Sequence, residues 1–134
     1  EETPKPNVEL GDILMLCRGV RFTAGVISDL PGSTVVQNMF YIIRLVESSG
    51  LLPKFIACYI NSAAVQEYFK ALGKGATVQH IRVADLASLR LPTHPIEEQQ
   101  KIVAIAEAQV EEQQLVERLS ELRTQQLNAI FQTL

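Results

Sequence analysis

Residues 96–134 read IEEQQKIVAIAEAQVEEQQLVERLSELRTQQLNAIFQTL, without a single glycine or proline. Pro95 suits the first position of a helix, and Glu97 and Glu98 follow in the first turn, where the helix dipole favours acidic side chains. The segment therefore predicts one uninterrupted helix, about 58 Å long at ~1.5 Å per residue.

An apolar stripe follows this predicted helix with the alternating spacing of a heptad seam, and its register shifts near Arg123. Because helices in water are stabilised mainly by packing an apolar face, the helix either folds back over its own domain or pairs with a second helix. The seam extends beyond the reach of so small a domain, which favours pairing and predicts a homodimer through residues 100–134. The candidate interface residues are Ile105, Leu115, Leu119, Leu122, Leu127, Ile130 and Leu134.

The first 95 residues predict an α+β domain. Apolar runs at 13–17, 24–27 and 39–46 have strand length and indicate a small, mostly antiparallel sheet. Residues 53–72 change to helical spacing: Pro53 suits a helix start, Asn61–Ser62 can end one helix and cap the next, and Gly73 closes the second. A loop at 73–80 follows, then a short strand at 81–83, a helical turn at 84–89 and a strand edge at 90–92. We therefore divide the chain into a domain, residues 1–95, and a long helix, residues 96–134.

Composition and charge are those of a globular protein. The net charge is −3, but residues 96–134 carry 3 basic against 7 acidic side chains, which leaves residues 1–95 at +1. A near-neutral front permits DNA contact through a local patch. No apolar run has the roughly 18 residues of a membrane-spanning helix. Cys17 and Cys58 lie among apolar neighbours, as reduced core thiols of a cytoplasmic protein do; a disulfide or metal pair is the minority reading.

Four motifs, taken in order, resemble the specificity subunits of type I restriction–modification systems. They are the GDIL strand at 11–14 with Arg18–Gly19 after it, the helix LPKFIACYINS at 52–62, the loop GKGATVQHI at 73–81, and the junction LPTHPIEEQQKIV at 91–103. The junction is the most specific of the four, and the resemblance covers residue 10 to the C-terminus. The chain is thus identified as a member of this family with a single target-recognition domain and one conserved helix.

The resemblance implies a non-catalytic subunit that recognises one half of a bipartite site in double-stranded DNA. In the family, antiparallel pairing of two helices sets the gap between half-sites, and methyltransferase subunits, and through them restriction subunits, dock on the assembly. S-adenosylmethionine and ATP belong to those partners, so no cofactor is expected here. The two prolines of the junction, Pro92 and Pro95, restrict the backbone and form a stiff elbow before the helix. His94 stands where the family usually has Pro or Leu, which should loosen that elbow slightly.

The family's usual subunit has two domains and two helices, whereas this sequence has one of each, and little precedes its GDIL strand. The chain therefore corresponds to a fragment, a half-subunit, or a shortened relative. The alternative function is a protein-interaction module, an adaptor of the same fold that does not read DNA.

Candidate DNA contacts lie in two loops. Around Gly19 they are Arg18 and Arg21, and in the 73–80 loop they are Lys74, Thr77, Gln79 and His80. The basic side chains suit phosphates, and Gln79 suits an adenine edge. The alternative for both loops is an ordinary solvated surface, which is also the preferred interpretation of Lys54, Lys70 and Arg82.

The sequence contains no pattern typical of a catalytic or metal site. His80 and His94 lie far apart and have no Cys or carboxylate at ligand spacing, so we expect no metal. The serines lack a nucleophile motif, and Asp12, Asp29 and Asp85 stand at turns, where hydrogen bonds to the local backbone explain them. We expect no enzymatic activity.

Overall fold

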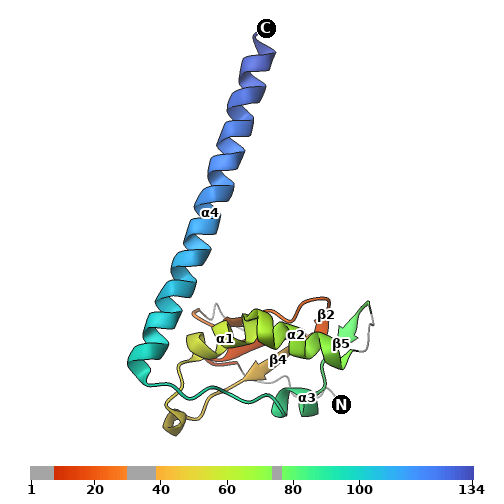
Figure 1. Cartoon of the computed structure of the whole chain (residues 1–134), viewed down its shortest axis with the longest axis vertical. Coiled ribbons are helices and arrows are strands. Elements are labelled where there is room, and N and C mark those ends of the chain that lie inside the picture. The colour runs from red at the N-terminus through yellow and green to blue at the C-terminus, as the bar shows by residue number, and fades with distance from the viewer. Residues whose placement is uncertain (1–7, 30–38, 74–76) are drawn as a thin grey trace. The chain divides into compact units, whose positions relative to one another are not determined.

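The computed structural model describes residues 8–29, 39–73 and 77–134 (Figure 1). The chain divides into two compact units, Glu1–Gln100 and Lys101–Leu134, and each is described here by itself. A small antiparallel sheet, short helices and a long C-terminal helix confirm the expected α+β class.

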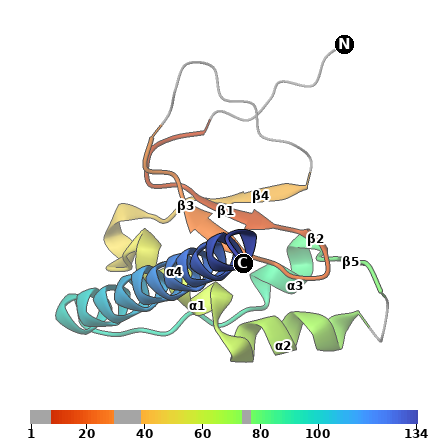
Figure 2. The same cartoon turned by 90° about the horizontal axis from the view of Figure 1, so that it is seen from above.

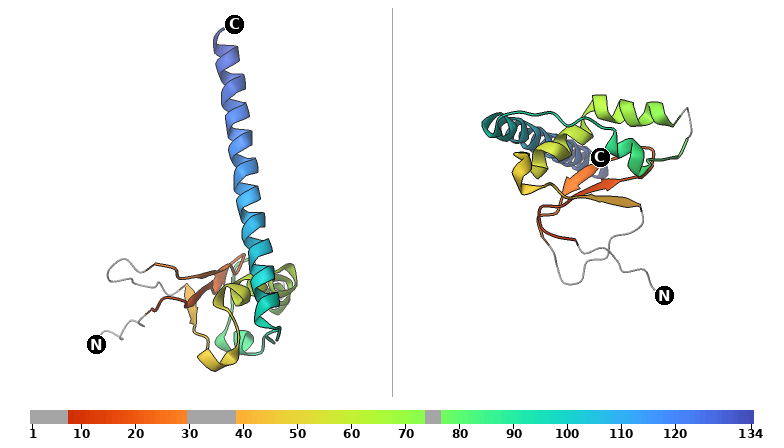
Figure 3. Two further views of the ribbon diagram at one scale, coloured as in Figure 1. Left: turned by 90° about the vertical axis from the view of Figure 1, so that its left-hand side faces the viewer. Right: turned by 90° about the horizontal axis from the view of Figure 1, so that it is seen from below.

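The three-stranded sheet has β1 (Ile13–Leu16) at its centre, between β3 (Ala24–Val26) and β4 (Phe40–Ile43), and both pairings are antiparallel. Its side chains alternate as a pleated strand requires: Ile13 and Met15 are fully buried, whereas Leu14 and Leu16 are half-buried. All three expected strands are present with shorter bounds. Two helices cover one side of this sheet, as the views from above and below show (Figures 2 and 3).

These helices are α1 (Pro53–Asn61) and α2 (Ala63–Leu72), and their predicted boundaries are confirmed. Pro53 is the first residue of α1. The Ser62 hydroxyl accepts a hydrogen bond from the Val65 N–H at 3.4 Å and so caps α2, which ends at Gly73. Their buried faces are Phe55, Ile56, Ala57 and Ile60 in α1, and Val65, Gln66 and Phe69 in α2.

Two expectations about the segment after residue 73 are wrong. The strand lies at β5 (Gln79–His80), not at 81–83, because Arg82 is instead the N-cap of a short helix, α3 (Val83–Ala87), where it pairs with Asp85 at 3.2 Å. The expected strand edge at 90–92 has no regular structure, and the Tyr59 hydroxyl donates to the Arg90 carbonyl there, at 2.9 Å. A 3-10 turn, η1 (Glu47–Ser49), precedes α1.

The long helix, α4 (Ile96–Gln132), is confirmed and ends two residues before the C-terminus. Its first five residues belong to the first compact unit. None of the helices in the described part of the chain combines the length and the apolar content needed to span a membrane.

Side-chain amides from the helices complete the outer edge of β3. The Asn61 side chain accepts from the Ala24 N–H and donates to the Ala24 carbonyl, both at 2.8 Å. The buried Gln66 side chain binds Phe22 in the same way, at 3.1 and 3.0 Å, and also donates to the Ile60 carbonyl. Each amide thereby replaces the hydrogen bonds of a neighbouring strand, which ties the chain around residues 22–24 to the helical layer.

A buried carboxylate fixes the start of β1. Asp12, 1% exposed, binds the Arg44 guanidinium through both oxygens, at 2.8 Å each, and also accepts from the Glu9 N–H at 2.9 Å. The expectation that local backbone explains Asp12 therefore accounts for only one of its partners. Hydrogen bonding to Arg44 holds the pKa of the Asp12 carboxyl below its ordinary value, and the Glu9 N–H lowers it further.

We expect Asp12→Ala to lower the free energy of unfolding by about 2 kcal/mol at pH 7, because it removes three charge-assisted hydrogen bonds, two of them from the Arg44 guanidinium. Since the folded pKa is lowered, this stabilisation is complete above the ordinary carboxyl pKa and disappears as the pH falls through the folded value. Urea unfolding at pH 7 and pH 3 measures both effects. The difference from the unaltered chain should shrink at pH 3; a constant difference would contradict this. Glu67→Ala, at an ion pair with Lys70 in which both side chains are exposed, is the control and should change stability much less.

Candidate nucleic-acid interface

The two loops in which the sequence predicts DNA contacts come together in one two-stranded ribbon. β2 (Arg18–Gly19) pairs antiparallel with β5, in the register Arg18 opposite His80 and Gly19 opposite Gln79. Directly opposite residues of an antiparallel pair project from the same face, so Arg18 and His80 share a face of the ribbon. Both residues are exposed.

The base of this ribbon is fixed to the buried core. Ile81 and Cys17 are fully buried, and the Ile81 N–H donates to the Cys17 carbonyl at 2.8 Å. The Cys17 N–H donates to the Met39 carbonyl at 2.8 Å, and the Tyr41 hydroxyl donates to the Ile81 carbonyl. The ribbon therefore presents its exposed residues from a rigid base.

Cys17 is buried and Cys58 is half-buried. Burial raises the pKa of the Cys17 thiol, and its Sγ donates to the Met39 carbonyl oxygen at 3.1 Å. Burial likewise raises the pKa of the Tyr41 hydroxyl, and the neighbouring Cys17 and Asp85 add to the effect. Both groups therefore stay neutral near pH 7, where they support the ribbon as hydrogen-bond donors.

Arg21 lies on the loop that leaves β2, next to a strongly anchored residue. Phe22 is fully buried and meets Phe69 edge-on at 5.7 Å, and the Gln66 amide holds its backbone. Arg21 itself is exposed. The backbone on which this guanidinium is mounted is thus fixed, although the side chain extends into solvent.

Gln79 is turned inward. Its Nε2 donates to the Phe69 carbonyl in the last turn of α2, and its side chain occupies the space where a Cβ on Gly73 would stand, 2.4 Å from that position. A glycine at 73 is therefore needed for this close approach. Thr77 is exposed. Lys74 lies outside the described residues.

Arg18 and Arg21 are two of several basic side chains in the described residues that no nearby carboxylate neutralises. Arg44, Lys70, Arg82 and Arg118 each have a carboxylate within 4.0 Å. Within the described ranges, Arg18 and Arg21 have no such partner. An unpaired, exposed guanidinium is available to an external anion such as a phosphate.

His80 completes the exposed face of the ribbon. Its ring meets that of Tyr41 edge-on at 6.4 Å, and Tyr41 is itself held by the Ile81 carbonyl. The pairing of β2 with β5 had no signal in the sequence, because strands of two residues are too short to show a period.

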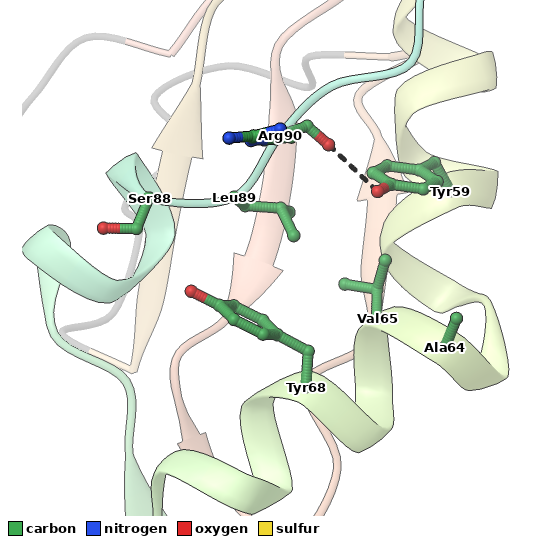
Figure 4. A pocket seen from close by; sticks show the side chains of 7 residues that line it. All are labelled: Tyr59, Ala64, Val65, Tyr68, Ser88, Leu89 and Arg90. Atoms are coloured by element: carbon green, nitrogen blue, oxygen red, sulfur yellow. Dashed lines mark hydrogen bonds between the residues drawn. The ribbon is translucent and has the colours of Figure 1, made fainter.

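The pocket shown in Figure 4 lies between α1, α2 and the segment after α3 and has a volume of about 350 Å³. Its lining residues are Tyr59, Ala64, Val65, Tyr68, Ser88, Leu89 and Arg90. The hydroxyls of Tyr59 and Tyr68 donate to the carbonyls of Arg90 and Asp85, at 2.9 and 3.3 Å. These contacts hold α3 and the segment after it against α1 and α2. In the part of the chain that the structure describes, no three His, Cys, Asp or Glu side chains gather as a metal site would need.

The second unit consists of the rest of α4, and all seven predicted interface residues are exposed. Their exposed fractions range from 45% at Leu122 to 91% at Leu134, and every residue from Glu107 onward is exposed. Six of the seven lie in α4, and Leu134 follows its end. A row of large apolar side chains without cover along one helix is typical of a surface that binds a partner.

The sequence model of the family described as "Type I restriction modification DNA specificity domain" matches residues 1–128 of the chain. The match includes the ribbon and almost all of α4. A comparison with curated proteins gives no match.

Proposed function

Because this chain belongs to the type I restriction modification DNA specificity family, we propose that it reads one half of a bipartite target in double-stranded DNA. The family's domain recognises DNA and is not catalytic, so the chain has a DNA-recognition role and is not an enzyme. The β2–β5 ribbon is our candidate for the reading surface. The observation that carries this choice is that Arg18 and His80, from distant parts of the sequence, project from one face of a ribbon with a buried base.

Each candidate residue has a proposed role. Arg18 and Arg21 bind phosphates, and Lys74 adds a third cation. His80 in β5 and Thr77, two residues before β5, are both exposed and contact base edges. Gln79 holds β5 against α2; to read an adenine edge, its amide would first have to leave the Phe69 carbonyl. These assignments rest on exposure, on unpaired charge and on the register of the ribbon.

We further propose that two copies of the chain pair through α4, with the helices antiparallel. Residues 96–117 carry six acidic side chains and one basic, whereas residues 118–134 carry two basic and one acidic. Antiparallel pairing places the acidic part of one helix beside the basic part of the other, and parallel pairing places like charges together. Two-fold symmetry then makes the two half-sites identical and inverted. Methyltransferase subunits dock on this dimer, as the family resemblance implies.

The test is the methylation pattern of the assembled complex. The chain is expressed with its methyltransferase subunit in cells that lack adenine methylation, and N6-methyladenine is mapped along the genome by sequencing. We expect methylation in one bipartite motif, an inverted repeat with a fixed spacer. Methylation without a motif would contradict DNA reading by this chain, and a motif with two different half-sites would contradict the homodimer.

The alternative, an interaction module that keeps the fold without reading DNA, is favoured by the second unit alone. Its exposed apolar row requires a protein partner, and the acidic charge of residues 96–117 opposes contact with DNA. This alternative predicts that the chain forms a stable complex with the methyltransferase subunit. The complex and the methyltransferase subunit alone should then bind DNA with the same affinity. A mobility-shift titration at several salt concentrations distinguishes the two functions.

A further inference from the structure

Gln99 is buried where its neighbours are exposed. It is 0% exposed, whereas the three residues before it and Gln100 after it are all exposed. Its side chain makes three hydrogen bonds of 2.8 Å. Oε1 accepts from the Leu52 N–H, and Nε2 donates to the carbonyls of Gly50 and His94. Both amide hydrogens are therefore used, as burial of a polar group requires.

These three bonds join segments that lie far apart in the sequence. Gly50 and Leu52 belong to the turn that leads into α1, and Leu52 is the N-cap of that helix without a side-chain cap of its own. His94 belongs to the elbow before α4. A single amide thus ties the first turn of α4 both to the elbow and to the helical layer of the body.

The ring of His94 strengthens the same joint. It meets the buried Phe55 of α1 edge-on at 6.0 Å, and its Nδ1 lies 3.1 Å from Glu98 Oε2. The expected loosening of the elbow by a histidine at position 94 is therefore not what the structure shows. His94 is held by its ring, by its carbonyl and by the next turn of the helix.

We propose that Gln99 is a positioning residue, which anchors the first turn of α4 and thereby fixes the spacer length that the paired subunit accepts between half-sites. For its effect on DNA, this inference rests on the proposed function. Because α4 is long, a small change of angle at its first turn causes a large displacement of its far end. For the 37 residues of α4, at ~1.5 Å per residue, a tilt of about 10° moves the far end by about 10 Å. That displacement equals about three base pairs at ~3.4 Å each.

Two substitutions remove the anchor in different ways, and a neighbouring residue supplies the control. Gln99→Met keeps the length of the side chain and loses all three hydrogen bonds without introducing a charge. Gln99→Glu keeps the oxygen that faces Leu52 but replaces the donor to Gly50 and His94 with a buried acceptor. Gln100→Glu makes the same chemical change one residue later, at an exposed position.

The first measurement is the spacer length in the methylation motif described above. The unaltered chain and Gln100→Glu should methylate sites with one spacer length, whereas Gln99→Met should also methylate sites with spacers one or more base pairs longer or shorter. The half-site sequences should stay the same. A residue needed only for folding would reduce methylation at all sites alike and leave one spacer length, and that result would overturn the inference.

The second measurement does not depend on DNA. Spin labels are placed by Ala71→Cys on α2 and Glu111→Cys on α4, both exposed positions, in a chain carrying Cys58→Ser and diluted with unlabelled chain. The distance distribution between the two labels should broaden with Gln99→Met and Gln99→Glu and stay narrow with Gln100→Glu. An equal width in all chains would overturn the inference. If the unaltered chain produces no motif, the proposed function fails, and this distance measurement alone decides the role of Gln99.

Discussion

A chain carrying Leu119→Glu and Leu122→Glu is expected to be monomeric at micromolar concentrations at which the unaltered chain is a dimer. Both leucines lie in α4, and each is nearly half exposed in the single chain. Replacing them therefore leaves the isolated helix almost unchanged and acts on the pairing.

The expected effect on pairing is large. Each buried leucine contributes roughly 2 kcal/mol, and a symmetric dimer loses four of them while it gains four like charges along one seam. We expect the dissociation constant to rise at least a thousand-fold, which corresponds to about 4 kcal/mol. Sedimentation velocity between about 1 and 100 μM measures this change.

A control adds the same charge away from the seam. Gln114→Glu and Thr124→Glu also add two negative charges per chain, but neither position belongs to the apolar row. This variant should remain dimeric. An unaltered chain that sediments as a monomer over the whole range would refute pairing through α4, and a charge variant of the leucines that stays dimeric would locate the interface elsewhere.

The helices and most strands of this fold could be predicted because their signals are local. Pro53, Ser62 and Gly73 each act on the backbone next to them and so mark helix ends. The apolar spacing of residues 96–134 and their lack of glycine and proline predict α4. The β2–β5 ribbon gave no such signal. Its strands have two residues each, so the pairing of Arg18 with His80 depends on the sheet and on α2, which bring the two segments together.

The buried polar residues could not be predicted from the sequence either. Gln66 and Gln99 belong to a type that is usually exposed, and what buries them is the position of distant backbone groups, at Phe22 in one case and at Gly50 and Leu52 in the other. The residues next to a glutamine in the sequence do not indicate which distant backbone groups its side chain will bind. Single residues of the candidate site could therefore be predicted from the sequence. The contacts that hold the site rigid could not, because they join segments far apart in the sequence.

An Arg18→Ala, Arg21→Ala chain, assembled with its methyltransferase subunit, is expected to bind DNA far more weakly and with a smaller dependence on salt. The two guanidinium groups have no carboxylate partner among the residues that the structure describes, so their charge is available to phosphates. Because the dimer carries two copies of each arginine, the variant removes four candidate phosphate contacts. Each contact contributes about 0.9 to the slope of log K against log salt concentration.

The slope is negative, and its magnitude should therefore fall by about 3 to 4, while affinity at 0.1 M salt should fall roughly a thousand-fold. Folding should be preserved, since Arg18 pairs with His80 through its backbone and Phe22 stays anchored by Gln66. Lys70→Ala with Arg82→Ala removes the same charge from two side chains that already have carboxylate partners, and it should change both quantities much less. Equal losses in the two variants would mean that net charge, and not the ribbon, governs binding. An unchanged slope in the arginine variant would remove both residues from the DNA interface.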